Sequence, residues 1–139
     1  MAQSRGDSLR SIDVRALSLT SALGRLAIGA GMVAAPARTL RALGFSEAGS
    51  ATITIGRLAG FRDLVLGAVT LTSLNRPDAL RAASLANAGA DGGDVIAFAI
   101  AFGGGERTAA IRGIASALPA AIAGIWVAGR LGTARCPRS

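Results

Sequence analysis

The chain has 139 residues, of which 51% are hydrophobic and only 17% are charged. This length predicts a single domain, and the composition, with a mean hydropathy of +0.50, favours a membrane protein. The net charge of +7 does not indicate nucleic-acid binding, because the 15 basic residues are all arginines spread along the chain instead of gathered on one face.

Residues 1–16 form a polar lead-in in which arginine and aspartate alternate, and we expect it to be solvated or interfacial. The first apolar segment covers residues 17–35 and stops at Pro36. Residues 33–35 resemble a signal-peptidase site, but Arg25 interrupts the apolar run and Pro36 would follow the cut. We therefore interpret 17–35 as a retained membrane span.

A short amphipathic stretch follows the first span. In residues 36–44 arginines are interspersed with leucines, which predicts a short helix in the membrane interface that ends at Gly44. The second span covers residues 51–74. The polar turn at 75–78 contains Pro77, which suits the start of the next helix.

Two more spans are predicted at residues 79–102 and 108–131, separated by glycines at 103–105, and a cytoplasmic tail follows at 132–139. All four segments are close to the ~20 residues that a membrane helix needs. The sequence therefore predicts an all-α fold, in which residues 17–131 form an antiparallel, up-and-down bundle of four transmembrane helices. A soluble bundle is the alternative, but its helices should carry broad charged faces, which the third and fourth spans lack.

Arginines outside the predicted spans are divided unevenly between the two sides of such a bundle. Eight lie on the side of the termini: Arg5, Arg10, Arg15, Arg76, Arg81, Arg130, Arg135 and Arg138. Three lie on the other side: Arg38, Arg41 and Arg107. Because positive residues favour the cytoplasmic side, we predict a multi-pass protein of the cell membrane with both termini in the cytoplasm.

Six ionised residues fall inside the predicted spans, three of each sign. They are Arg25 in the first span, Arg57, Arg62 and Asp63 in the second, and Asp91 and Asp94 in the third. An unpaired charge at mid-bilayer costs ~3 kcal/mol or more, so we expect these residues to be paired and to face the bundle interior. From the helical rise of ~1.5 Å per residue, Arg57 should pair with Asp94, and the other four should share the mid-membrane layer.

Small and polar residues form stripes on the predicted helices. The second helix carries a close-packing seam made of Gly56, Gly60, Asp63 and Gly67, and the third an inward polar face made of Ser84, Asn87, Asp91 and Asp94. The fourth has a small-residue face made of Gly113, Ala117, Ala121, Gly124 and Ala128. Residues 29–34 match the G-x-G-x-x-A pattern of dinucleotide-binding proteins, but no strand precedes them, so helix packing explains these glycines better.

The residue types limit the chemistry that this cluster can perform. The chain has no histidine, and Cys136 is its only cysteine, so internal disulfides and imidazole or thiolate metal sites are excluded. Asp91 and Asp94 flank two glycines as in a turn for a hard cation, but two carboxylates beside three arginines make a poor cation site. We predict no cofactor and no metal, and we expect the two glycines to allow a kink or a close backbone approach.

The candidate site consists of Arg25, Arg57, Arg62, Asp63, Asn87, Asp91 and Asp94, with catalytic residues unknown. Buried ion pairs can fix a helix arrangement without doing chemistry. The first interpretation is therefore a binding or accessory component, whose partners are the lipid bilayer, a lipophilic or anionic small ligand, a second copy or another membrane protein.

Two other functions stay open for this site. A membrane enzyme acting on a lipophilic substrate would use Asp91 or Asp94 as general acid or base, while Arg62 or Arg57 holds an anionic group. A small transporter or proton pathway would need a polar file across the membrane, and the apolar residues 95–102 oppose such a file.

Three parts of the sequence resemble a known family. They are residues 56–67, the Asp91 and Asp94 pair, and Arg25 followed by Pro36. Over about residues 17–131 the chain is similar to small, four-helix bacterial membrane proteins of unknown function. The resemblance implies an integral membrane protein, and it assigns no role to the charged residues.

Overall fold

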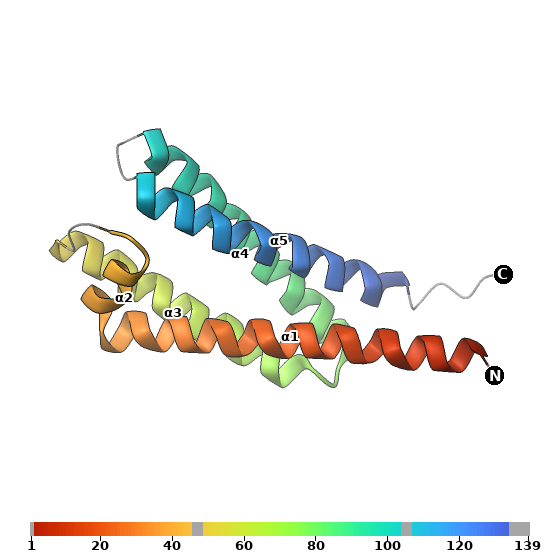
Figure 1. Cartoon of the computed structure of the whole chain (residues 1–139). Helices are drawn as coiled ribbons and strands as arrows, with labels where there is room; N and C mark the ends of the chain where they lie inside the picture. Colours follow the sequence, from red (N-terminus) through yellow and green to blue (C-terminus); the bar gives the residue numbers. More distant parts are fainter. Residues whose placement is uncertain (1, 46–48, 104–106, 134–139) are drawn as a thin grey trace.

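The computed structural model describes residues 2–45, 49–103 and 107–133, with side chains from residue 13 onward. Over these residues the protein is all-α, as predicted. The helices are α1 (Ala2–Ala34), α2 (Pro36–Ala42), α3 (Ser50–Ser73), α4 (Pro77–Gly103) and α5 (Arg107–Thr133) (Figure 1). Three predicted features lie outside the described residues: the glycines at 104 and 105, the side chains of the lead-in before residue 13, and the tail from residue 134.

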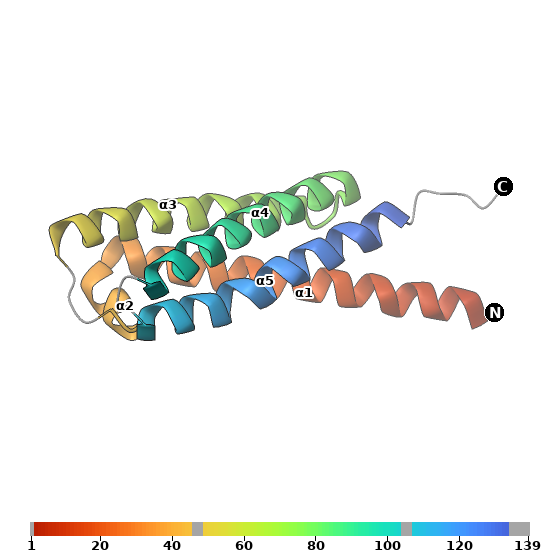
Figure 2. The same cartoon turned by 90° about the horizontal axis from the view of Figure 1, so that it is seen from above.

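The four long helices associate as two pairs (Figures 1 and 2). α1 packs along α3 and α4 packs along α5, whereas contacts between the pairs are much sparser. The predicted glycine seam explains the first pair, because a Cβ at Gly60 would lie 2.7 Å from Met32 Cβ and a Cβ at Gly67 would also press on α1. A Cβ at Gly29 would lie 2.7 Å from the carbonyl oxygen of Gly60. Glycines on both helices therefore allow this close approach.

The small-residue face of α5 forms the contact with α4. Gly113, Ala117, Ala121 and Ala128 are buried. A Cβ at Gly124 would lie 2.9 Å from the carbonyl oxygen of Ser84 on α4. Packing through small residues, predicted for this face, is therefore confirmed.

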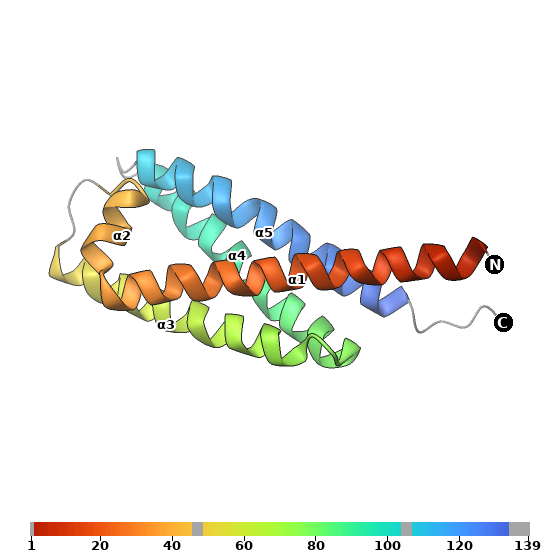
Figure 3. The ribbon, with the colours of Figure 1, turned by 60° about the horizontal axis from the view of Figure 1, so that its bottom comes forward.

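The two pairs meet near the start of α4 and the last turns of α5, and they diverge toward the start of α5 (Figure 3). Val14, Leu80 and Val127 are buried together at the converging end, with Leu74 and Leu131 packed against them. Val14 belongs to the segment predicted as a solvated or interfacial lead-in. α1 is one continuous helix from residue 2, because no proline interrupts it before residue 36. Of the lead-in side chains that the structure describes, Val14 is buried, whereas Asp13, Arg15 and Ala16 are exposed.

The short helix predicted after the first span is present as α2. Its end has the hydrogen bonds of a Schellman motif: the N–H of Gly44 donates to Arg41 and the N–H of Phe45 to Leu40. Gly44 has a φ of +97°, a conformation that glycine adopts at little cost. Arg112 on α5 donates to the carbonyl oxygen of Ala42, which connects α2 to the start of α5.

Among the described residues, three helices are long and apolar enough to cross a membrane, by length and composition. They are Asp13–Ala34 within α1, the whole of α4 and the whole of α5. The sequence predicted four. α3 has the predicted length but carries Arg57, Arg62 and Asp63 within 24 residues, which lowers its apolar content.

Candidate functional site: a buried arginine and aspartate cluster

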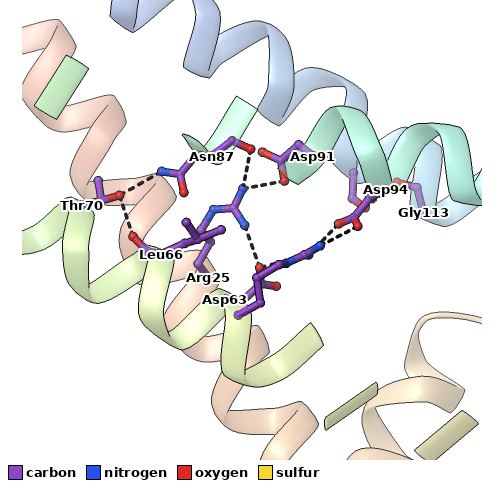
Figure 4. A network of polar contacts seen from close by, with 10 residues as sticks. Arg25, Asp63, Leu66, Thr70, Asn87, Asp91, Asp94 and Gly113 are labelled. Atoms are coloured by element: carbon purple, nitrogen blue, oxygen red, sulfur yellow. Dashed lines mark hydrogen bonds and ion pairs between the residues drawn. The ribbon is translucent and has the colours of Figure 1, made fainter. Parts of the chain in front are cut away.

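Arg25 lies at the centre of an ion cluster that joins three helices (Figure 4). From α1, its Nη1 lies 2.8 Å from Asp63 Oδ1 on α3, and its Nη2 lies 2.5 Å from Asp91 Oδ1 on α4. Nη2 also donates to the carbonyl oxygen of Asn87, and the Arg25 side chain is only 9% exposed. A single buried guanidinium thus bridges the α1–α3 pair and the α4–α5 pair.

Arg62 on α3 forms the second bridge between the pairs. Its Nη1 and Nη2 donate to the two carboxylate oxygens of Asp94 on α4 at 2.8 and 2.7 Å, a bidentate geometry. Nη2 also lies 3.3 Å from Asp63 Oδ1, so Asp63 contacts both arginines. The Arg62 and Asp94 side chains are 36% and 32% exposed, which places this bridge at the edge of the cluster.

Asn87 and Thr70 extend the network on its buried side (Figure 4). The Asn87 Nδ2 donates to Thr70 Oγ1 at 2.9 Å, and the Thr70 hydroxyl donates to the carbonyl oxygen of Leu66. Thr70 is not among the predicted site residues. Its spacing offered a clue, because it follows Asp63 by seven residues, which is two helical turns on the same face.

Arg57 does not belong to the cluster. It is exposed, and Asp94 pairs with Arg62, so the predicted pair between Arg57 and Asp94 is wrong. The reason is rotation about the helix axis, because Arg57 and Arg62 lie on opposite sides of the glycine seam and the Arg62 side reaches α4. The structure brings together the other predicted site residues: Arg25, Arg62, Asp63, Asn87, Asp91 and Asp94.

Asp91 and Asp94 do not converge on a common point. They engage different arginines, although only two residues separate them. α4 continues as a helix through Gly92 and Gly93, and a Cβ at either glycine would meet no atom within 4 Å. The close backbone approach predicted at these glycines is therefore wrong.

The cluster contains more negative than positive side chains. Three carboxylates face two guanidiniums when all are ionised, because Arg57, which completed the predicted balance of three against three, lies elsewhere. The Nη atoms of both arginines are already engaged by carboxylates, which leaves the buried Nε of Arg25 and of Arg62 without a partner. This geometry suits a structural link between helices better than a binding site for an anion.

No family model, curated protein or solved structure matches this chain. The resemblance to small, four-helix bacterial membrane proteins stays a prediction. The functional assignment therefore rests on the contacts, burial and charges described above.

Proposed function

We propose that this chain is a multi-pass integral membrane protein with four spans that acts as a binding or accessory component. In this proposal the ion cluster holds the two helix pairs together. Large apolar side chains on the outer faces support insertion into lipid. Ile55 and Leu58 on α3, Ile100 on α4 and Ile122 on α5 are each more than half exposed. Soluble monomers rarely expose apolar surface on several long helices at once.

α3 is the proposed fourth span, because large apolar side chains lie on its outer surface while Asp63 is paired inside the bundle. Ile55, Leu58 and Val65 are exposed, whereas Asp63 turns inward to Arg25. Arg57 lies ~10 Å from the start of the helix at 1.5 Å per residue, so its long side chain can reach the interface. Inward ion pairing lowers the cost of placing this helix in lipid.

In this proposal the four spans alternate in direction, and both termini are cytoplasmic. The start of α1 and the end of α5 lie toward the same end of the molecule, which supports an even number of crossings (Figures 1 and 2). The excess of arginines on that side supports the orientation. Arg130 lies over the ring of Trp126 at 4.9 Å, a combination typical of a membrane–water interface.

The bridge made by Arg25 is the observation that supports a structural role for the ion cluster. α1 and α3 pack through glycines, and α4 and α5 pack through glycine and alanine, but the cluster connects one pair to the other. Buried ion pairs can specify one arrangement among several with similar packing. A binding or accessory role fits a protein whose buried charged groups pair with one another. The apolar outer faces of the helices are available for contact with a second copy or with another membrane protein.

Membrane insertion gives the first testable prediction. After cell fractionation, the protein should stay in the pellet when membranes are washed with alkaline carbonate, because spans held by lipid are not released by charge disruption. A peripheral membrane protein in the same sample should be released, which serves as the control. Recovery of this chain as a soluble monomer without detergent would overturn the proposal.

The orientation is tested through the single cysteine of the chain. Cys136 should react with a membrane-impermeant maleimide only after the cells are permeabilised, since the tail is proposed to be cytoplasmic. A Cys136→Ser variant should stay unlabelled in both conditions. Labelling of Cys136 in intact cells would contradict the proposed cytoplasmic location of the tail.

A further inference from the structure

Four exposed arginines surround the end of the molecule at which the two helix pairs meet. The apolar side chains buried there are Val14, Leu80 and Val127, with Leu74 and Leu131 packed against them. Within two residues of this apolar group the chain places Arg15 on α1, Arg76 in the turn before α4, Arg81 on α4 and Arg130 on α5. Residues next to one compact core lie near it in space, so these arginines gather at the same end.

The positive charge at this end exceeds the negative charge. Against the four arginines, the described part of the chain places two carboxylates there, Asp13 and Asp78. The Arg15 Nη2 donates to the neutral amide oxygen of Asn75 at 2.7 Å, and within the described residues Arg15 forms no ion pair. This end of the bundle therefore attracts anions.

Arg130 is the arginine of this group with the most defined surroundings. Its guanidinium carbon lies 4.9 Å from the centre of the Trp126 ring. No carboxylate of the described residues forms an ion pair with it. Stacking on an aromatic ring holds the plane of a guanidinium and leaves the N–H groups at its edge free, and these can bind a phosphate in bidentate fashion.

An apolar surface on α5 leads up to Arg130. Ile122, Trp126 and Arg130 follow one another at intervals of four residues, so their side chains lie on one face of the helix. Ile122 is 59% exposed and Trp126 is 40% exposed. This face is apolar along its length and positive at its end, which matches the acyl chain and the phosphate of a membrane lipid.

We propose that this end of the bundle binds an anionic phospholipid, with the phosphate on Arg130 and an acyl chain along Trp126 and Ile122. The neighbouring arginines Arg15, Arg76 and Arg81 add positive charge around the headgroup, which favours a lipid of net negative charge over a zwitterionic one. The inference rests on the proposed membrane function and names the lipid class that this surface selects, in either orientation. A chain that resists the carbonate wash but fails the lipid test below would overturn this inference alone.

The test is the melting temperature of the purified full chain in a nonionic detergent that contains increasing fractions of dioleoylphosphatidylglycerol or dioleoylphosphatidylcholine. The two lipids have the same acyl chains and differ in net charge. We expect phosphatidylglycerol to raise the melting temperature in a saturable way, and phosphatidylcholine to raise it less, because a lipid that binds the folded state stabilises it. Arg130→Gln should raise the phosphatidylglycerol fraction for half-maximal stabilisation about fivefold, the scale of one arginine at an anionic surface.

A matched control separates this surface from general charge effects. Arg38 is an exposed arginine on α2, at the other end of the molecule, so Arg38→Gln should keep the response of the unmodified chain (Figure 3). Arg76→Gln is a second variant of the site in case Arg130→Gln does not fold. Equal responses to the two lipids, or equal shifts in the site variants and the control, would overturn the inference. Stabilisation by soluble glycerol phosphate to the same extent as by phosphatidylglycerol would overturn it too, since the arginines would then bind a free anion instead of a lipid.

Discussion

Replacing Arg25 by glutamine should lower the free energy of unfolding in detergent by about 3 to 5 kcal/mol, the cost of removing one partner of a buried ion pair. The change removes the guanidinium partner of Asp91 and leaves Asp63 with only its 3.3 Å contact to Arg62. The side chains of these two aspartates are 10% and 14% exposed. The loss is expected to be large because Arg25 is also the residue that bridges the two helix pairs. Unfolding of the purified protein by a denaturing detergent would measure it.

Arg57→Gln is the matched control for this variant. Arg57 has the same charge and lies in the neighbouring helix α3, but it is exposed and outside the cluster. Its replacement should change stability by no more than about 0.5 kcal/mol, as is usual for surface substitutions. Equal losses of unfolding free energy in the two variants would contradict the structural role of the Arg25 bridge. The effect would then follow from the loss of a positive charge alone.

The second large effect is expected at the α1–α3 seam. Gly60→Ala should destabilise the protein by about 1 to 3 kcal/mol, the usual cost of overpacking, although alanine is the better helix former. The added Cβ would lie 2.7 Å from Met32 Cβ and 3.0 Å from the carbonyl oxygen of Gly29, so the two helices must move apart. Thermal unfolding in detergent would report the loss.

Gly93→Ala should act in the opposite direction. A Cβ at Gly93 meets no atom within 4 Å, so the substitution adds helix propensity without a clash and should stabilise α4 by up to about 1 kcal/mol. The two glycine variants thus differ in the sign of their effect. If Gly60→Ala were also neutral or stabilising, the α1–α3 packing described here would be wrong.

The sequence by itself determined the features that depend on local spacing. Three such features follow from turn chemistry and from the helical period. They are the residues of α2 with its end at Gly44, the start of α4 at Pro77, and the glycine seam of α3. The inward polar face of α4 follows in the same way, since Ser84, Asn87 and Asp91 recur at helical spacing and are all buried. These properties require only residues that are close together along the chain.

Only the tertiary structure decided which charges meet. Distance along a helix axis is set by the rise per residue, but which side chain faces a neighbouring helix depends on rotation about that axis. On α3 that rotation is fixed by glycines packed against α1, so Arg62 reaches Asp94 while Arg57 turns away. The contacts of Asp63 with both Arg25 and Arg62 depend on the same rotation, because they join residues whose relation sequence spacing alone does not show.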